Sequence, residues 1–362
     1  MENIEEKLGQ MIIVRMYGKT VSDELIDIIR NYKVGGIILY SNNYDSADEL
    51  INIINTLKEI NSKYNQYPLF IGTDQEGGRV NRMPHDFKNI KSSSKLVKNE
   101  NIENVKMAGH VTGKLLNRLG FNMNFAPVLD IQRFGDSHAI GDRCFGKLKE
   151  DVIKFAIPYM NELKKENIIP VAKHFPGHGA TKRDSHFLFP IVTKPLEELE
   201  RDDMEPFEEA IKNNVDAIMV SHMVISKIDR LYPVSISRKI IKKYLKEKYN
   251  FNGLIITDDL KMKSISLLYG YKRALSRAIF AQNDIIMIGA NYKSVKIAID
   301  NAKKAIKKNS YLQSTVEESF NKIIDKKVEY NLTDNKISDI TADEINEFNN
   351  EISVINSNCS KI

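Results

Sequence analysis

The chain has 362 residues, enough for one large barrel or two ordinary domains, and its 42% hydrophobic and 28% charged residues are typical of a globular protein with a substantial core. The net charge of +5 is small, and the lysine excess between Lys293 and Lys327 is typical of a solvated helical face, so no nucleic-acid partner is expected. Cys144 and Cys359 lie far apart and in no CxxC spacing, which excludes a disulfide framework or zinc knuckle.

The N-terminal segment MENIEEKLGQMIIV is acidic and lacks the pattern of a signal peptide. No apolar run along the chain approaches the roughly 20 residues that are needed to span a bilayer. We therefore expect a cytoplasmic protein without a membrane span.

Eight short apolar runs recur along the chain, with segments of helical periodicity between them. The runs are Met11–Met16, Val34–Tyr40, Pro68–Asp74, Phe121–Val128, Ile168–His174, Val215–His222, Gly253–Asp258 and Asp284–Ile288. The helical segments are Ser22–Tyr32, Asp48–Lys63, Asn101–Leu119, Asp151–Glu166, Pro195–Asn213, Ser237–Tyr249, Ser264–Gln282 and Tyr292–Lys308. Strands that alternate with helices in this way predict parallel βαβ units.

Eight such units favour an α/β fold with a single closed (β/α)8 TIM-type barrel over an open doubly wound sheet. A nucleotide-binding sheet loses support because no GxGxxG follows the first strand and no P-loop is present. We expect the catalytic barrel to span residues 1–310. Residues 311–362 are expected to form a C-terminal helix, over Leu312–Val328, and a polar tail that is peripheral to the barrel and without chemistry.

Polar residues fall at or just after the carboxyl ends of five predicted strands. They are Asp74, Asp130, His174, His222 and Asp258. In a TIM barrel the carboxyl ends of the strands converge on one face, where the chemistry takes place. The pattern therefore predicts that these side chains gather on the polar face of the barrel.

The segment Ile168–His186 carries the densest set of chemically active side chains. It begins as an apolar run that predicts a buried strand, and its Pro176, Gly177 and Gly179 then predict a loop. The polar side chains that it delivers are Lys173, His174, His178, Asp184 and His186. A strand that ends in this way is typical of an active site at the strand's carboxyl end.

Two interpretations of these histidines follow from their spacing. Imidazoles and a carboxylate on one barrel face are ligands of zinc or iron sites, but a metal dication next to Lys173, the neighbour of His174, would cost energy. Asp184 and His186, two residues apart, suit an Asp–His hydrogen bond that fixes one tautomer and makes the imidazole an acid/base group. Spacing alone leaves both interpretations open.

Two loops combine acids, arginines and glycines. The first, DQEGGRVNR over Asp74–Arg82, suits a loop whose backbone approaches a polar ligand closely, or else a strand–helix turn with a structural salt bridge. The second, IGDRCFG over Ile140–Gly146, contains Asp142 and Arg143, which are interpreted either as a buried structural pair or as a ligand contact.

The seventh predicted strand ends in Asp258 and Asp259. A carboxylate at this place can attack an anomeric carbon or stabilise an oxocarbenium ion. The alternative is a cap of the following helix, which fits Asp259 better. Asp258, nearer the strand, is the better candidate for chemistry.

Six motifs together resemble glycoside hydrolase family 3, specifically its bacterial β-N-acetylhexosaminidase (β-N-acetylglucosaminidase) branch. They are DQEGGRVNR at Asp74–Arg82, NFAPVLDI at Asn124–Ile131, IGDRCFG at Ile140–Gly146, KHFPGHG at Lys173–Gly179, DSH at Asp184–His186 and ITDDLKM at Ile256–Met262. The resemblance covers about Met11 to Ala305. Some members carry a second domain after the barrel, and we expect the site of this chain to be built from the barrel alone.

The resemblance implies a role for each matching position. Asp258 matches the nucleophile that forms a covalent glycosyl-enzyme, and His186 matches the general acid/base, with Asp184 as its orienting partner. The positions that hold the N-acetylglucosamine residue are matched by Asp74, Arg82, Arg143, Lys173 and His174. No cofactor and no metal are implied, and activity is expected to survive a chelator.

The implied function is a retaining β-N-acetylglucosaminidase that removes terminal N-acetylglucosamine from muropeptides or related β-glycosides during cell-wall turnover. Three alternatives remain on the same sequence. They are a β-N-acetylglucosaminide phosphorylase, in which phosphate replaces water in the second step, a non-catalytic glycan-binding barrel, and a metal-dependent hydrolase.

Overall fold

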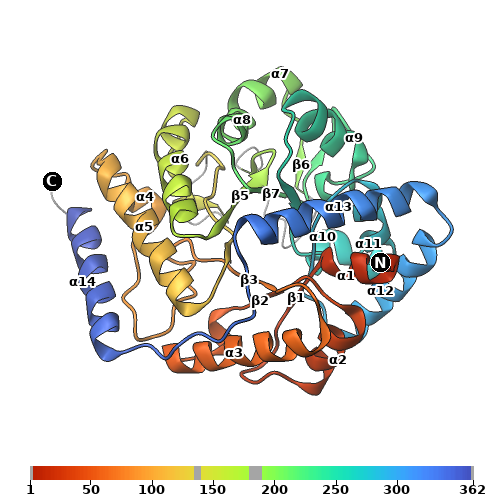
Figure 1. The fold of residues 1–362 in the computed structure, drawn as a ribbon. Helices are drawn as coiled ribbons and strands as arrows, with labels where there is room; N and C mark the ends of the chain where they lie inside the picture. The colour runs from red at the N-terminus through yellow and green to blue at the C-terminus, as the bar shows by residue number, and fades with distance from the viewer. Residues whose placement is uncertain (1–2, 134–139, 179–189, 360–362) are drawn as a thin grey trace.

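The computed structural model describes residues 3–133, 140–178 and 190–359. Eight parallel strands form the centre of the molecule (Figure 1). They are β1 (Ile12–Arg15), β2 (Gly36–Ile38), β3 (Phe70–Thr73), β4 (Met123–Asn124), β5 (Ile169–Phe175), β7 (Ala217–Val220), β9 (Leu254–Thr257) and β10 (Ile286–Ile288). Each lies within one of the predicted apolar runs or overlaps it.

The strands close into a barrel. They pair in the order β10-β1-β2-β3-β4-β5-β7-β9, and every pair is parallel. A parallel bridge between Ile256 and Ile285 joins the last strand in this order to the first. The side chains of β3, β7 and β9 are buried throughout, as expected for strands covered on both faces. The predicted (β/α)8 barrel is confirmed.

Helices surround the barrel (Figure 1). They are α1 (Ile4–Gln10), α2 (Asp23–Tyr32), α3 (Ala47–Tyr64), α4 (Ser93–Leu96), α5 (Ile102–Leu119), α6 (Lys149–Lys165), α7 (Leu196–Glu198), α8 (Glu205–Lys212), α9 (Arg238–Ile240), α10 (Lys263–Ser266), α11 (Gly270–Phe280), α12 (Tyr292–Ile306), α13 (Ser310–Glu329) and α14 (Ala342–Asn358). Shorter or wider turns are η1 (Ser41–Asn43), η2 (Gly141–Arg143), η4 (Leu199–Asp203), η5 (Val234–Ile236) and η6 (Ile241–Lys248).

Three predicted helices are interrupted in the structure. The segment 195–213 divides into α7, η4 and α8, the segment 237–249 into α9 and η6, and the segment 264–282 into α10 and α11. In the last case Gly270 has a φ of +63°, which a continuous right-handed helix does not contain. A small second sheet, β6 (Ile191–Val192) with β8 (Val224–Ile225), was not predicted.

The residues after 310 contain two helices, α13 and α14. Helix α13 packs against α1, and its Lys327 reaches under the barrel, where Nζ donates to Gln10 Oε1 (2.8 Å) and to the Gly35 carbonyl (3.1 Å). Nζ also lies 4.7 Å from the centre of the Phe70 ring. Burial lowers the pKa of Lys327 to about 7. The domain boundary at residue 310 stays a prediction.

This buried lysine predicts a pH-dependent stability. Above pH 7 the folded chain loses the Lys327 proton while the unfolded chain keeps it up to its ordinary pKa, so the stability of the fold rises with pH in this window. Between pH 7 and 9 the unfolding free energy of the wild type should therefore rise, relative to that of Lys327→Met, by roughly 1 kcal/mol per pH unit. Urea unfolding at several pH values measures this shift.

The matched control is Lys326→Met. The pKa of Lys326 is raised, because its hydrogen bonds to Asp216 and Glu329 outweigh its burial. Its removal should therefore leave the pH slope unchanged. Parallel curves for the wild type and Lys327→Met would contradict the prediction.

Candidate active site

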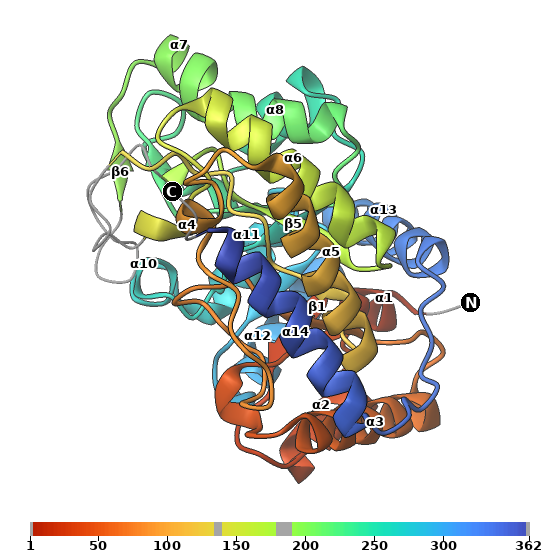
Figure 2. The same cartoon turned by 90° about the vertical axis from the view of Figure 1, so that its left-hand side faces the viewer.

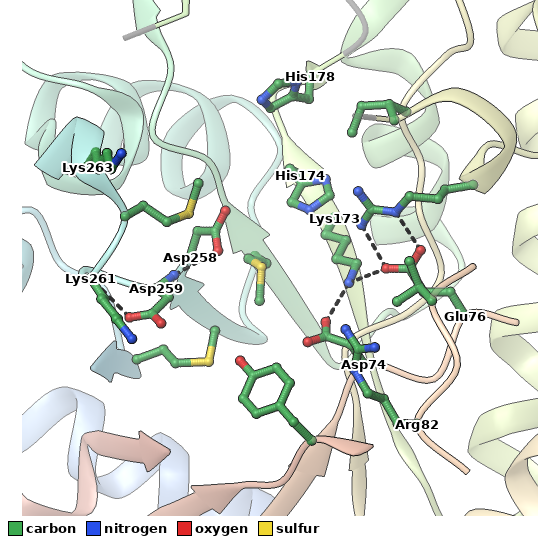
Figure 3. A pocket seen from close by; sticks show the side chains of 17 residues that line it. Asp74, Glu76, Arg82, Lys173, His174, His178, Asp258, Asp259, Lys261 and Lys263 are labelled. Carbon is green, nitrogen blue, oxygen red and sulfur yellow. Dashed lines mark hydrogen bonds and ion pairs between the residues drawn. The ribbon is translucent and has the colours of Figure 1, made fainter. Parts of the chain in front are cut away.

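A cavity of about 600 Å³ lies at the carboxyl ends of the barrel strands (Figure 3). Its lining comes from β5, β7 and β10 and from the segments after β2, β3, β4, β5 and β9, which is where TIM barrels carry their active sites. Six residues predicted for the site line it: Asp74, Arg82, Arg143, Lys173, His174 and Asp258. The other two, Asp184 and His186, lie outside the described residues.

Glu76 joins three segments of the cavity wall. Its carboxylate accepts two hydrogen bonds from Arg143, from Nε (2.7 Å) and from Nη2 (2.8 Å), and forms an ion pair with Lys173 Nζ at 2.6 Å. Lys173 Nζ also donates to Asp74 Oδ1 at 2.7 Å. Figure 3 shows this cluster on one side of the cavity. Two acids and two bases thus balance each other in one buried group.

The charges in this cluster are fixed. Burial alone would raise the pKa of Glu76, but Arg143 and Lys173 hold it well below its ordinary value. Burial would likewise lower the pKa of Arg143, and Glu76 raises it. Each charge in the pair therefore favours the ionised form of the other.

Of the two interpretations of Asp142 and Arg143, the mutual pair is not formed, and Arg143 lines the cavity. Asp142 instead pairs with Arg79, at 2.8 Å between Arg79 Nε and Asp142 Oδ1. Asp142 and Arg143 both belong to the turn η2. Consecutive residues in such a turn point in different directions, so the two side chains meet different partners. Glu76 was not singled out from the sequence, although it lies in the DQEGGRVNR motif two residues after Asp74. The only signal at Glu76 is an acid followed by two glycines, and local spacing does not connect it to Arg143.

Asp130 holds His174 in one orientation. The two are buried, and Asp130 Oδ2 lies 2.7 Å from His174 Nδ1. Burial would raise the pKa of Asp130, but the imidazoles of His174 and His178 lower it, so the carboxylate accepts and Nδ1 carries the proton. His174 therefore meets a ligand through Nε2. Asp130 Oδ1 also accepts from the backbone N–H of His178 at 2.6 Å, which fixes the start of the loop after β5.

Asp258 lies across the cavity from Lys173 and His174 (Figure 3). Its Oδ1 accepts a hydrogen bond from its neighbour's N–H, that of Asp259, at 2.7 Å. Burial alone would raise its pKa, but the imidazoles of His222 and His174, the backbone bond and Lys173 hold the pKa below the ordinary value of 3.8. An ionised carboxylate in a polar cavity is the state that a nucleophile requires.

His222 follows the carboxyl end of β7, as predicted, but its side chain does not line the cavity. It is buried beneath the loop after β9, where Nε2 lies 2.9 Å from the Asp259 carbonyl and Nδ1 lies 2.7 Å from Ser235 Oγ. A carbonyl only accepts, so Nε2 carries the proton, and burial lowers the pKa of the ring. The proximity of the His222 imidazole to Asp258 favours the ionised form of that carboxyl group.

Asp259 has a structural task. Its Oδ1 accepts hydrogen bonds from the backbone N–H groups of Gly289 (2.7 Å) and Lys261 (2.8 Å), which ties the loop after β9 to the end of β10. Burial raises its pKa. Of the two neighbouring carboxyl groups, Asp259 holds the loop, and Asp258, with its lowered pKa, is the better candidate nucleophile.

The described part of the chain offers no group of three or more His, Cys, Asp or Glu side chains arranged to hold a metal ion. His174 and His178 come closest, with ring centres 6.0 Å apart. The two positions that the metal interpretation also needed, Asp184 and His186, are not described. None of the described helices is both long and apolar enough to cross a bilayer.

Residues 3–326 match the N-terminal domain of glycosyl hydrolase family 3. The chain belongs to this family. It is 33% identical over 291 residues to the β-hexosaminidase of Tolumonas auensis, covering 80% of this chain and 85% of that protein. With the β-hexosaminidase of Haemophilus influenzae it shares 30% identity over 297 residues, covering 81% and 83%. The resemblance noted in the motifs is confirmed, and this family 3 chain is a glycoside hydrolase.

A family 3 β-N-acetylglucosaminidase from Paenibacillus sp. has a similar solved structure. It superposes with a TM-score of 0.91 at 29% identity, covering 98% of this chain and 69% of that one. The similarity therefore extends beyond residue 326, through the C-terminal helices.

The ion cluster predicts the effect of Glu76→Gln. The substitution leaves Lys173 and Arg143 buried beside a neutral partner, and breaking a buried pair in this way costs about 3–5 kcal/mol. Urea unfolding near neutral pH should show this loss. Glu59→Gln, which breaks only exposed pairs with Lys63 and Lys336, is the control and should leave the midpoint nearly unchanged. Equal effects of the two substitutions would show that the cluster does not stabilise the barrel.

Proposed function

We propose that the protein is a retaining β-N-acetylhexosaminidase that removes terminal N-acetylglucosamine from β-glycosides. The observation that carries this proposal is the ionised Asp258 facing a polar wall of Asp74, Lys173 and His174 across one cavity. A nucleophile on one side and donors and acceptors for sugar hydroxyls on the other are what glycoside cleavage requires. The names of the family relatives and of the Paenibacillus structure support the N-acetylglucosamine specificity.

The sugar-binding wall offers complementary partners. Asp74 accepts from hydroxyl groups, Lys173 donates, and His174 presents Nε2. The Arg82 guanidinium lies 5.5 Å from the Tyr40 ring centre, and its buried Nε has no hydrogen-bond partner among the residues described. Because a buried donor without a partner is costly, Nε of Arg82 is a site for a substrate oxygen. Arg143 donates two hydrogen bonds to Glu76 and so fixes the shape of the wall.

The proposed reaction has two steps. Asp258 attacks the anomeric carbon while His186, protonated and oriented by Asp184, gives its proton to the departing oxygen, which leaves a glycosyl-enzyme ester on Asp258. Water then loses a proton to His186, attacks the same carbon, and releases the sugar and the Asp258 carboxylate with net retention. Lys173 and His174 hold the sugar in both steps.

The alternative on the same scaffold is a phosphorylase that transfers the sugar to phosphate, whereas a non-catalytic glycan-binding barrel is disfavoured by the family to which the chain belongs. A role in cell-wall muropeptide turnover and a cytoplasmic location are proposals of the same standing. The ionised state of Asp258 favours catalysis over binding alone, since a binding barrel needs no poised nucleophile.

Substrate specificity tests the function directly. The protein should cleave an aryl β-N-acetylglucosaminide roughly 10²-fold faster, in kcat/KM, than the matching β-glucoside, because the site would leave partners of the missing acetamido group unpaired. Release of the aryl group measures both rates. Adding phosphate should not change the sugar product from N-acetylglucosamine to its 1-phosphate. Preference for the glucoside would overturn the proposed specificity, and a phosphorylated product would establish the phosphorylase.

Chemical rescue tests the catalytic roles. General acid catalysis contributes ~10²–10⁴-fold, and an activated phenolate needs little of it. His186→Ala should therefore lose more activity on a natural disaccharide than on an aryl glycoside, and with the latter it should accumulate glycosyl-enzyme. Azide, which needs no base, should restore turnover and give the β-glycosyl azide, identified by mass spectrometry and NMR.

Asp258→Ala is the contrasting variant. It should accumulate no glycosyl-enzyme and form no β-azide, because no carboxylate remains to attack the anomeric carbon. Near-normal turnover by Asp258→Ala, or no azide rescue of His186→Ala, would show that the roles are assigned wrongly and would make Asp259 the next candidate nucleophile.

A further inference from the structure

Helix α14 lies along α5 at the edge of the barrel (Figure 2). Arg118 on α5 pairs with Glu344, at 2.6 Å between Nε and Oε1, and Lys114 pairs with Glu347 (3.0 Å) and Glu351 (3.3 Å). The whole helix follows residue 326, where the match to the family domain ends. Helix α14 is thus held against α5 by ion pairs.

Two asparagines of α14 hold the segment 86–91 by its backbone. Asn349 accepts from the Lys88 N–H (2.7 Å) and donates to the Asp86 carbonyl (2.8 Å). One heptad later, Asn356 accepts from the Lys91 N–H (3.0 Å) and donates to the Asn89 carbonyl (2.9 Å). Residues seven apart share one face of a helix, so the two side chains act as a pair of clamps.

The clamped segment supports the glycine turn of the cavity loop. Gly78 N–H donates to the Ile90 carbonyl at 2.7 Å, and the Asn89 side chain donates to the Gly78 carbonyl at 2.6 Å. The approach is so close that a Cβ on Gly77 would lie 2.9 Å from the Ile90 oxygen, and one on Gly78 would lie 2.5 Å from Ser92 Cβ. Both glycines have positive φ, +86° and +57°.

This glycine turn also sets the positions of two cavity residues. The N–H groups of Glu76 and Gly77 both donate to the Val80 carbonyl at 3.1 Å, which closes the loop on itself. Glu76 forms ion pairs with Lys173 and Arg143. The backbone N–H of Arg82 donates to Gln75 Oε1 at 2.7 Å. A continuous series of hydrogen bonds therefore leads from α14 to the sugar-binding wall.

We propose that Asn349 and Asn356 are positioning residues, through which α14 holds the loop 76–82 in its sugar-binding shape. This inference rests on the proposed function, since it assigns Arg82 and the Glu76 cluster to the sugar. Neither asparagine lines the cavity, and each acts only through the segment 86–91.

The test is the double variant Asn349→Ala/Asn356→Ala in the full chain. Its KM for an aryl β-N-acetylglucosaminide should rise roughly tenfold to a hundredfold, because a loop misplaced by about 1 Å binds the sugar poorly. Its kcat should stay within about threefold, since Asp258 lies on the far wall and is untouched. The dissociation constant of N-acetylglucosamine, measured by calorimetry, should rise in parallel with KM.

The matched control is Asn346→Ala/Asn350→Ala, which changes two exposed asparagines of the same helix. It should leave KM and kcat as in the wild type. In the test variant the Asp86 carboxylate still accepts from the Ala47 N–H (2.7 Å), and the Lys88 and Lys91 side chains can still donate to Ser353 Oγ (2.7 Å) and to the backbone carbonyl of residue 356 (2.8 Å). The segment therefore keeps anchors that do not use the two asparagine side chains, and the barrel should fold. If the double variant does not fold, each single substitution removes one clamp and should raise KM by a smaller factor.

Hydrogen exchange separates this inference from the proposed function. The amide of Gly78, bonded to Ile90, should exchange faster in the test variant than in the wild type and the control, whatever glycoside the enzyme cleaves. A wild type that ignores N-acetylglucosaminides would overturn the proposed function but not this result. Unchanged exchange at Gly78 together with an unchanged KM for the glycoside that is cleaved would overturn the role of α14.

Discussion

The buried carboxylate of Glu76 is the constraint on which the site depends. It ties the loop after β3 to Lys173 of β5 and to Arg143 of η2, three segments that are distant in the sequence. Removing two cations from water is unfavourable unless an anion of good geometry meets both, and Glu76 does so with three contacts of 2.6 to 2.8 Å. The wall of the cavity therefore has one low-energy arrangement.

That arrangement also fixes the charge that Asp258 meets. Lys173 divides its ammonium group between Asp74 and Glu76, so the wall carries no excess positive charge to neutralise the nucleophile by direct pairing. At the greater distance across the cavity its field still favours the ionised form of Asp258. The imidazoles of His222 and His174 favour the ionised form as well. Among the described residues Asp258 has no ion pair of its own, and its lowered pKa favours the ionised form.

The sequence predicted the features that arise from local periodicity. The predicted run 168–174 corresponds to β5 (Ile169–Phe175), because a parallel strand that is buried on both faces has a nearly continuous apolar sequence. It also predicted which strand ends are polar, since their order along the chain sets their place around the barrel. Pairings across the fold were out of reach, as the partner of Arg143 and the burial of His222 show. Spacing along a chain carries no information on which side chain lies opposite.

The asparagines of α14 also show that the sequence does not reveal which groups a side chain contacts. An asparagine-rich, polar C-terminal segment is what a solvated helix looks like in sequence, and Asn349 and Asn356 differ from the exposed Asn346 and Asn350 only in what lies opposite them. A glycine pair with positive φ gives the cavity loop a close approach to residues 90–92, but glycine alone selects no single conformation. The selection must come from a rigid partner behind the loop. Because α14 supplies that partner from beyond the family domain, the affinity for the sugar can be altered there without any change to the residues that touch it.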